Sequence, residues 1–169
     1  LAQLQVGDVR TVNGGPFIAI HAHDNQHHLK NEASWRLVPL HQVVLAAGFI
    51  EYVSAVRQSG SSRLFPALKA DRFDKLSFGF SKWFGRYMDH CGLTDPSTDF
   101  HCFRATFKDL CRCARVPEDV HDALTGRTAE GRQVSRSYGN RQYPEAPLVD
   151  AVSAFIVPDV DFSLPAAAR

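Results

Sequence analysis

Short apolar runs near the start of the chain have the lengths and boundaries of β-strands. Val9–Val12 and Phe17–His21 flank an Asn-Gly-Gly-Pro turn, and Asn-Gly between β-prone runs is a strong hairpin signal. A third run, Trp35–Leu40, follows the polar segment His23–Ser34. The pattern predicts a three-stranded antiparallel sheet with one long loop, and Pro39 indicates an edge strand or a strand end.

The first six residues have a different spacing. Leu1, Leu4 and Val6 lie at near-helical intervals, and Gly7-Asp8 then interrupts them as a helix C-cap would. We interpret this segment as the last turns of a helix whose beginning is missing. On this interpretation the chain is a fragment of a longer protein.

From His41 onward, apolar residues recur at the intervals typical of amphipathic helices. Pro117 and the two acids after it suit the first turn of a helix. The predicted helices cover residues 41–58 with a break at Gly48, 76–91, 99–114, 117–126 and 146–156. We expect a flexible tail at residues 158–169.

Two of these helices carry marked apolar faces. The rings of the helix at 76–91 repeat with helical spacing, so we assign them to the core rather than to a base-stacking surface; they are Phe78, Phe80, Trp83, Phe84 and Tyr87. The last helix can pack its apolar face on its own domain or on a neighbouring protomer. That face consists of Leu148, Val149, Val152, Phe155 and Ile156.

The composition of the chain limits the classes of protein to which it can belong. The 169 residues are 44% hydrophobic and 22% charged, which suits one domain with a real core. The formal net charge is only +1, so a nucleic-acid surface would require local clustering of arginine and lysine. The four cysteines lack the spacing of a zinc knuckle or a disulfide framework, which favours a reduced, cytoplasmic protein. No apolar run approaches the ~18 residues of a membrane span, so we expect no membrane partner.

His101 and Arg104 are the strongest candidates for chemistry. They are three residues apart on one predicted helix, so both side chains could reach a single phosphate. A guanidinium binds phosphate oxygens bidentately, and a neighbouring imidazole can add a hydrogen bond or move a proton. Taken alone, such a pair is more often an ordinary feature of a helix surface.

Two further polar clusters have ordinary and functional interpretations. The histidines at 21, 23, 27 and 28 could chelate a metal, but they lack cysteine or carboxylate partners at ligand spacing, which favours a solvated loop. Four arginines surround Tyr138 and could be a solvated basic segment or a path for a phosphate backbone, and we favour the second. These are Arg127, Arg132, Arg136 and Arg141.

The order of short motifs along the chain resembles the catalytic domain of the tyrosine recombinases, the phage-integrase family. The matching pieces are Lys30 before Trp35–Leu40, then Leu64-Phe65-Pro66, His101-x-x-Arg104, Leu124-Thr125-Gly126 and Tyr138-Gly139. The resemblance implies an α+β, mostly α fold: a helical recombinase catalytic domain over residues 1–157, truncated at its N-terminus, with a small three-stranded antiparallel sheet.

The resemblance also implies roles for individual residues. Tyr138 would attack a phosphodiester, form a covalent 3′-phosphotyrosine and release a 5′-hydroxyl. Arg104 would hold the non-bridging oxygens, and His101 would accept a proton or donate to the phosphate. Lys30 would protonate the leaving 5′ oxygen. Lys69 and Lys75 are rival lysines, and Tyr143 is the rival nucleophile.

The implied partners are double-stranded DNA and other recombinase protomers in a tetrameric synapse, with no metal and no cofactor. The implied setting is a prokaryotic or phage-encoded cytoplasmic protein that acts in DNA recombination or integration. One alternative is a degenerate, non-catalytic DNA-binding relative of the same fold. Another is a metal-dependent nuclease or binding protein that uses the histidine cluster.

The chain departs from the family pattern at two points. Arg127 stands where many members have a second histidine, and an arginine can donate hydrogen bonds but cannot accept a proton near neutral pH. We therefore expect altered or slower chemistry there. The family's first catalytic arginine lies upstream of the sequence that matches Leu1–Leu4, so this fragment alone is expected to cleave DNA poorly or not at all.

Overall fold

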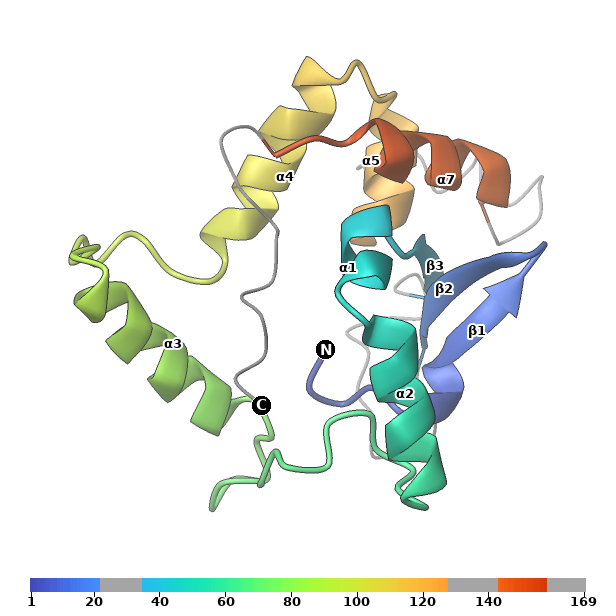
Figure 1. The fold of residues 1–169 in the computed structure, drawn as a ribbon. Helices are drawn as coiled ribbons and strands as arrows, with labels where there is room; N and C mark the ends of the chain where they lie inside the picture. Colours follow the sequence, from blue (N-terminus) through green and yellow to red (C-terminus); the bar gives the residue numbers. More distant parts are fainter. Residues whose placement is uncertain (22–34, 128–142, 158–169) are drawn as a thin grey trace.

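The computed structural model describes residues 1–21, 35–127 and 143–157, which form a mixed α+β structure (Figure 1). Its antiparallel sheet has the order β1 (Val9–Val12), β2 (Gly15–Ile20) and β3 (Arg36–Pro39). The predicted sheet is confirmed. Pro39 is the last residue of β3, which lies at one edge of the sheet, as its proline indicated.

The turn between β1 and β2 explains the tight hairpin. Val12 pairs with Gly15, so the connection consists of Asn13 and Gly14 alone. Both have positive φ, 48° and 83°, the backbone that a two-residue hairpin turn with right-handed strand twist requires. Asparagine and glycine tolerate this region best, which is why the Asn-Gly signal is reliable here.

The helices begin and end close to the predicted positions. Gly48, with φ of +81°, separates the first two helices, as predicted. The elements are a 3₁₀-helix η1 (Val6–Asp8), α1 (Gln42–Ala46), α2 (Phe49–Gln58), α3 (Phe78–His90), α4 (Cys102–Cys113), α5 (Glu118–Thr125) and α7 (Glu145–Ala154).

The helix expected at residues 1–6 is wrong. Gln5 forms an isolated antiparallel bridge with Arg63, and the Leu4 carbonyl oxygen accepts a hydrogen bond of 2.9 Å from the Leu64 amide. Leu4 and Val6 are both buried and are two residues apart, which is the period of an extended chain. The same few apolar positions fit either period, and only the pairing with the segment at residues 62–64 distinguishes them.

The buried side chains form three clusters that join the sheet to α2, α5 and α7. One cluster lies between the N-terminal segment, α2 and Leu64; a second lies between α5 and α7; and a third lies on the sheet around Phe17 and Leu37. Leu148 of α7 is buried, whereas Val149 of the same helix is exposed. Ile156 lies beyond the end of α7 and is 76% exposed, so the predicted apolar face is only partly covered within the described residues.

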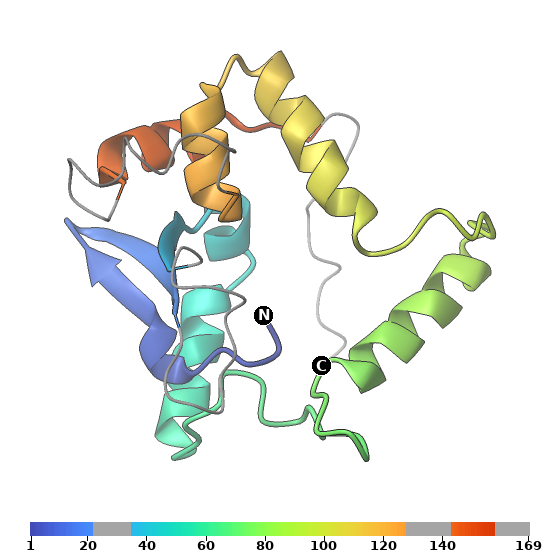
Figure 2. The same ribbon diagram turned by 180° about the vertical axis from the view of Figure 1, so that it is seen from behind.

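The assignment of the α3 aromatic residues to the core is wrong. No residue of α3 is buried, and Trp83 is 56% exposed. Phe80 and Phe84 contact Phe100 near the start of α4, each with ring centroids 5.2 Å apart. In Figures 1 and 2, α3 stands apart from the sheet and from α2. Helical spacing predicts an apolar face but does not say which surface covers it.

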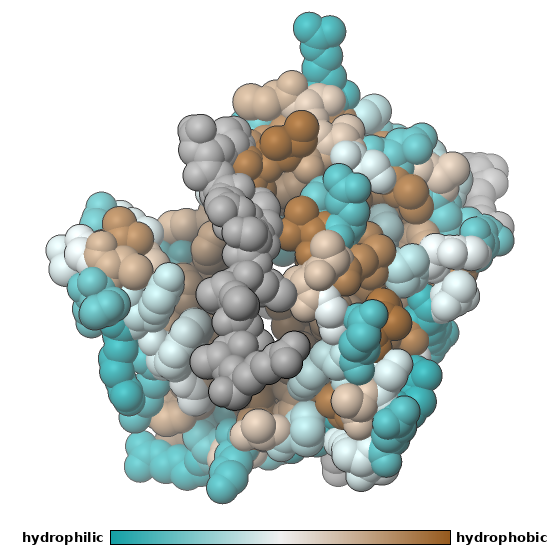
Figure 3. Space-filling view, viewed as in Figure 1, coloured by the Kyte–Doolittle hydropathy of each residue, from teal (hydrophilic) through white to brown (hydrophobic). Residues whose placement is uncertain are grey.

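The surface reflects this arrangement. In Figure 3 the more hydrophobic residues gather on the right-hand half of the view, where the sheet and the core helices lie. The α3 side of the same view is mainly hydrophilic or intermediate. The three buried clusters also lie at the sheet, α2, α5 and α7, and α4 connects α3 to this part of the molecule.

Candidate functional site

Two arginines converge on the C-terminal end of α5. Arg104, from α4, donates from Nη2 to the carbonyl oxygen of Thr125 at 3.0 Å. Arg36, the first residue of β3, donates from Nε to the carbonyl oxygen of Leu124 at 3.0 Å. Carbonyls in the last turn of a helix have no partner within the helix and carry the negative end of its dipole. One helix end thus holds guanidinium groups from two other elements.

Gly126 shapes this helix end. Its φ of +67° is the left-handed conformation that closes many helices, and the Arg127 amide donates back to the Asp122 carbonyl at 3.0 Å. A Cβ atom at position 126 would lie 2.5 Å from Nη1 of Arg36. The Leu-Thr-Gly sequence therefore both ends α5 and leaves room for the Arg36 side chain.

The two guanidinium groups lie close enough to influence each other. Partial burial and then the nearby charge of Arg104 lower the pKa of Arg36, although a guanidinium stays protonated at any physiological pH. Among the described residues, no carboxylate lies within ion-pair distance of Arg104. The exposed side chain of Arg127 follows directly after Gly126.

His101 lies at the N-cap of α4, one position before the helix begins. The Arg104 amide donates to the His101 carbonyl at 2.9 Å, so the two residues are one turn apart, as their spacing predicted. The His101 side chain is exposed and Arg104 is half-buried. In the described residues no hydrogen bond joins these two side chains, so it is Arg104 that the fold brings to α5.

Tyr143, the rival nucleophile, lies at the other end of α5. Its hydroxyl donates to Oδ2 of Asp119 at 2.8 Å, and Asp119 is in the first turn of the helix. Burial and then this hydrogen bond raise the pKa of Tyr143, which keeps the phenol protonated. At a rise of 1.5 Å per residue, Asp119 and Thr125 are about 9 Å apart along the axis. This position does not suit a nucleophile that acts beside Arg104.

Several candidate residues lie outside the described part of the chain. These are Lys30, Tyr138, Arg132, Arg136, Arg141, His23, His27 and His28. The rival lysines, Lys69 and Lys75, are exposed in the segment between α2 and α3 and not on the sheet.

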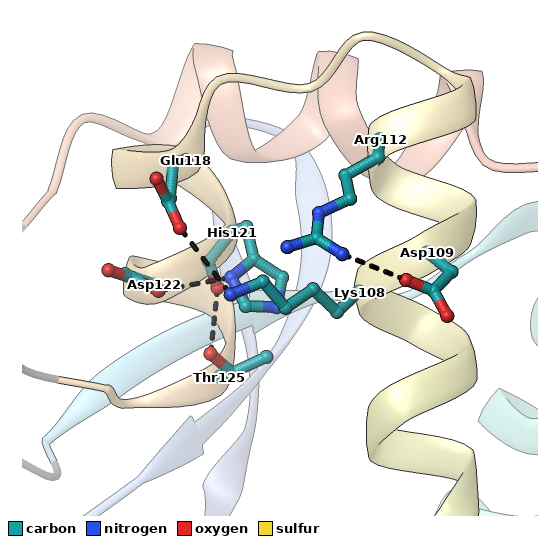
Figure 4. A network of polar contacts seen from close by, with 7 residues as sticks. All are labelled: Lys108, Asp109, Arg112, Glu118, His121, Asp122 and Thr125. Carbon is teal, nitrogen blue, oxygen red and sulfur yellow. Dashed lines mark hydrogen bonds and ion pairs between the residues drawn. The ribbon is translucent and has the colours of Figure 1, made fainter.

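One polar contact, shown in Figure 4, and one aromatic contact join α4 to α5. Lys108 Nζ lies 3.4 Å from Oε1 of Glu118, and the buried His121 ring stacks on Phe107 with centroids 5.9 Å apart. Nδ1 of His121 lies 3.0 Å from a carboxylate oxygen of Asp122. These contacts join the same two helices as the hydrogen bond from Arg104 to Thr125.

His21, the described member of the histidine cluster, contacts Asp8 and Arg10 near the start of β1. Its Nε2 lies 3.1 Å from Oδ1 of the buried Asp8 and 3.1 Å from Nη2 of Arg10. Asp8 also accepts a hydrogen bond from the Gln5 amide at 2.8 Å. No group of three histidine, cysteine or acidic side chains that could hold a metal occurs in the described ranges.

Two residues of this region were missed by sequence reasoning. Arg36 was taken only as part of a strand, although an arginine inside an apolar run is a signal that it has a specific partner. His121 gave no signal, because its burial depends on how α4 and α5 pack.

Comparisons with protein-family models, with curated proteins and with solved structures find no match to this chain. Within the described residues, every helix is too short or too polar to cross a membrane. The functional interpretation therefore depends on the motifs and on the contacts between them.

Proposed function

We propose that the chain is the catalytic domain of a site-specific DNA recombinase or integrase of the tyrosine recombinase type. The observation that carries the proposal is the 3.0 Å hydrogen bond from Arg104 to Thr125. It joins the His-x-x-Arg motif to the Leu-Thr-Gly motif, which come from different helices. Motifs that matched the family pattern by chance would have no reason to meet in space.

The contact suits the role proposed for Arg104. A guanidinium has five N–H donors, and anchoring Nη2 on a helix carbonyl fixes its orientation while leaving other donors for a phosphate. A cation held in place before reaction stabilises developing charge without a cost of reorganisation in the transition state. Arg104 would therefore stabilise the charge on the non-bridging oxygens.

The proposed reaction is a transesterification. The phenolic oxygen of Tyr138 forms a bond to phosphorus, its proton passes to His101, and the bond from phosphorus to the 5′ oxygen breaks. Lys30 protonates that 5′ oxygen. The product is a 3′-phosphotyrosine and a free 5′-hydroxyl, which can attack in the reverse direction to rejoin a strand. Arg127 would add hydrogen bonds to the phosphate but accept no proton.

A trapping experiment tests this function. The full-length natural protein is incubated with nicked duplex DNA of random sequence, so that a released fragment diffuses away. Digestion and mass spectrometry should find a DNA-linked peptide modified at Tyr138. The adduct should be absent in Tyr138→Phe and retained in Tyr143→Phe.

The same experiment separates the alternatives. A wild-type protein that binds duplex DNA but yields no adduct would identify the degenerate DNA-binding relative and overturn the catalytic proposal. Cleavage that excess chelator abolishes would identify a metal-dependent nuclease instead. An adduct on Tyr143 would overturn the assignment of the nucleophile.

A further inference from the structure

We propose that the exposed aromatic face of α3 binds unpaired DNA, with bases stacked on Trp83 and Tyr87 and backbone phosphates bound by Lys82 and Arg86. Stacking and phosphate binding would suit any unpaired nucleic-acid strand, so the choice of DNA rests on the proposed function. The surface lies on a different helix from Arg104 and takes no part in the proposed reaction.

The first argument is the pair of parallel rings that α3 exposes. Trp83 is 56% exposed and Tyr87 is 50% exposed. They are four residues apart, so they lie on the same side of the helix, with ring centroids 5.5 Å apart and ring planes 13° apart. Two nearly parallel rings form a flat apolar surface, and a planar base of any sequence can stack on such a surface.

The second argument is that other rings support this pair. The Phe80 ring centroid lies 5.7 Å from that of Trp83 and 5.2 Å from that of Phe100 near the start of α4. The Phe84 and Phe100 centroids are also 5.2 Å apart. Trp83 is therefore at the edge of a larger aromatic cluster, which restricts its ring before a ligand binds. A surface ordered in advance loses less entropy on binding.

The third argument is the placement of cations beside the rings. Lys82 Nζ lies 4.5 Å from the centroid of the Phe78 ring, and Arg86 is one helical turn after Trp83. In the described ranges no carboxylate lies within ion-pair distance of either cation. Asp89 is the single carboxylate of α3. Exposed rings next to cations are the combination that single-stranded nucleic acids use, through their bases and their phosphates.

The same charges argue against an apolar partner on this face. A hydrophobic surface that covered Trp83 and Tyr87 would also remove water from the neighbouring Lys82 and Arg86, and burying an unpaired charge is costly. The α3 helix of a second copy would offer one carboxylate, Asp89, for these two cations. An unpaired strand supplies one phosphate with each base, so it satisfies the rings and the cations together.

Binding of a labelled thymidine oligonucleotide to the full-length natural protein, measured by fluorescence anisotropy, tests the proposal. Trp83→Leu should weaken binding by about fivefold or more, the usual effect of losing one stacked base. Trp83→Phe keeps a ring and should bind more tightly than Trp83→Leu. Trp35→Leu is the matched control, because Trp35 is an exposed tryptophan outside α3, and it should bind as the wild type does. Equal affinity in wild type and Trp83→Leu would overturn the inference.

An abasic oligonucleotide of the same length separates stacking from a structural role. It has the same phosphates but no bases, so the wild type should bind it more weakly, and Trp83→Leu should lower its affinity no further. An equal loss for both oligonucleotides in Trp83→Leu would show a structural role and overturn the inference.

The salt dependence tests the role of the cations. If Arg86 binds one phosphate, Arg86→Gln should reduce the slope of log affinity for the thymidine oligonucleotide against log salt concentration by about 0.7, the value for one phosphate of a single strand. An unchanged slope would overturn the assignment of Arg86 to the strand.

Two other occupants are recognised by the same variants. Tighter binding of a uridine RNA oligonucleotide than of the thymidine oligonucleotide would assign the face to RNA and overturn the choice of DNA. Self-association that Trp83→Leu abolishes, measured by sedimentation and without a change in oligonucleotide binding, would assign the face to a second copy and overturn the inference.

The outcomes also distinguish this inference from the proposed function. Tyr138→Phe should abolish the covalent adduct and leave binding of the thymidine oligonucleotide unchanged. Binding that depends on Trp83 in a protein that forms no adduct would support the aromatic face and overturn catalysis. An adduct in a protein whose oligonucleotide binding ignores Trp83 would do the reverse.

Discussion

At the scale of single residues, the position that organises the site is a glycine. Gly126 ends α5 in the left-handed conformation, and its missing side chain admits Arg36. The helix end in turn presents the two carbonyls that hold Arg36 and Arg104. Backbone conformation, steric space and electrostatics thus all depend on one residue type at this position.

We predict that Gly126→Ala destabilises the protein. An alanine at φ of +67° is strained by about 1–2 kcal/mol, and its Cβ would displace the Arg36 side chain, so the free energy of unfolding should fall by at least about that amount. Urea denaturation followed by circular dichroism measures it.

Gly85→Ala is the matched control. Gly85 is inside α3 and is not among the residues with positive φ, and a Cβ atom at this position would have no neighbour within 4 Å. Alanine there should therefore stabilise the protein by about 0.5–1 kcal/mol. If both alanine variants shifted stability in the same direction, the account of Gly126 would be wrong.

At the scale of elements, α3 and α7 have similar apolar patterns in the sequence but differ in burial. Both carry apolar residues at helical spacing, yet Leu148 of α7 is almost fully buried against α5, whereas α3 has no buried residue. The aromatic rings of α3 contact one another and Phe100 rather than the core. Amphipathicity predicts that a helix has an apolar face, and the tertiary fold decides whether it is covered.

This difference predicts that shortening a side chain to alanine lowers the free energy of unfolding more in α7 than in α3. Leu148→Ala should lower the free energy of unfolding by about 2–5 kcal/mol, because it leaves a cavity between α5 and α7. Trp83→Ala should lower it by no more than about 1 kcal/mol, because the side chain is 56% exposed. Chemical denaturation of both variants measures the comparison. A larger loss for Trp83→Ala would show that α3 is packed in solution against a surface that the described residues do not contain.

At the scale of the whole molecule, the described chain has a packed part and a projecting part. The sheet, α2, α5 and α7 share the three buried clusters, whereas α3 projects from the molecule and is connected through α4 (Figure 1). The hydrogen bond from Arg104 and the stacking of Phe107 on His121 are contacts that hold α4 to the packed part. The candidate site thus lies where the two parts meet.

Hydrogen exchange should reveal this division. Amides of α3 are expected to exchange with much lower protection than those of β2 and α5, because opening α3 exposes little buried apolar surface. Mass spectrometry of deuterium uptake by peptide measures the difference under native conditions. Equal protection in α3 and β2 would contradict the division.

Local chemistry made several features predictable from the sequence. Asn13-Gly14 specifies the hairpin turn, Gly48 separates α1 from α2, and Gly126 ends α5, because each requires a backbone that few residues tolerate. The spacing of His101 and Arg104 likewise holds, since it depends only on the helix that contains them.

Contacts between distant segments could not be predicted in the same way. The extended form of Gln5 depends on its bridge with Arg63, and the exposure of the α3 rings depends on the absence of a covering surface in the described molecule. The meeting of Arg36 with Arg104 on α5 requires three elements to pack first.

The sequence by itself determined the hairpin turn, the helices from residue 41 onward, the sheet and the motif order, because these depend on backbone preferences and on periodicity within short segments. Only the tertiary structure decided which apolar faces are buried, which tyrosine is tied to a carboxylate, and which arginines share a helix end. These depend on the distance between atoms far apart in the chain, and local spacing carries no information about that distance.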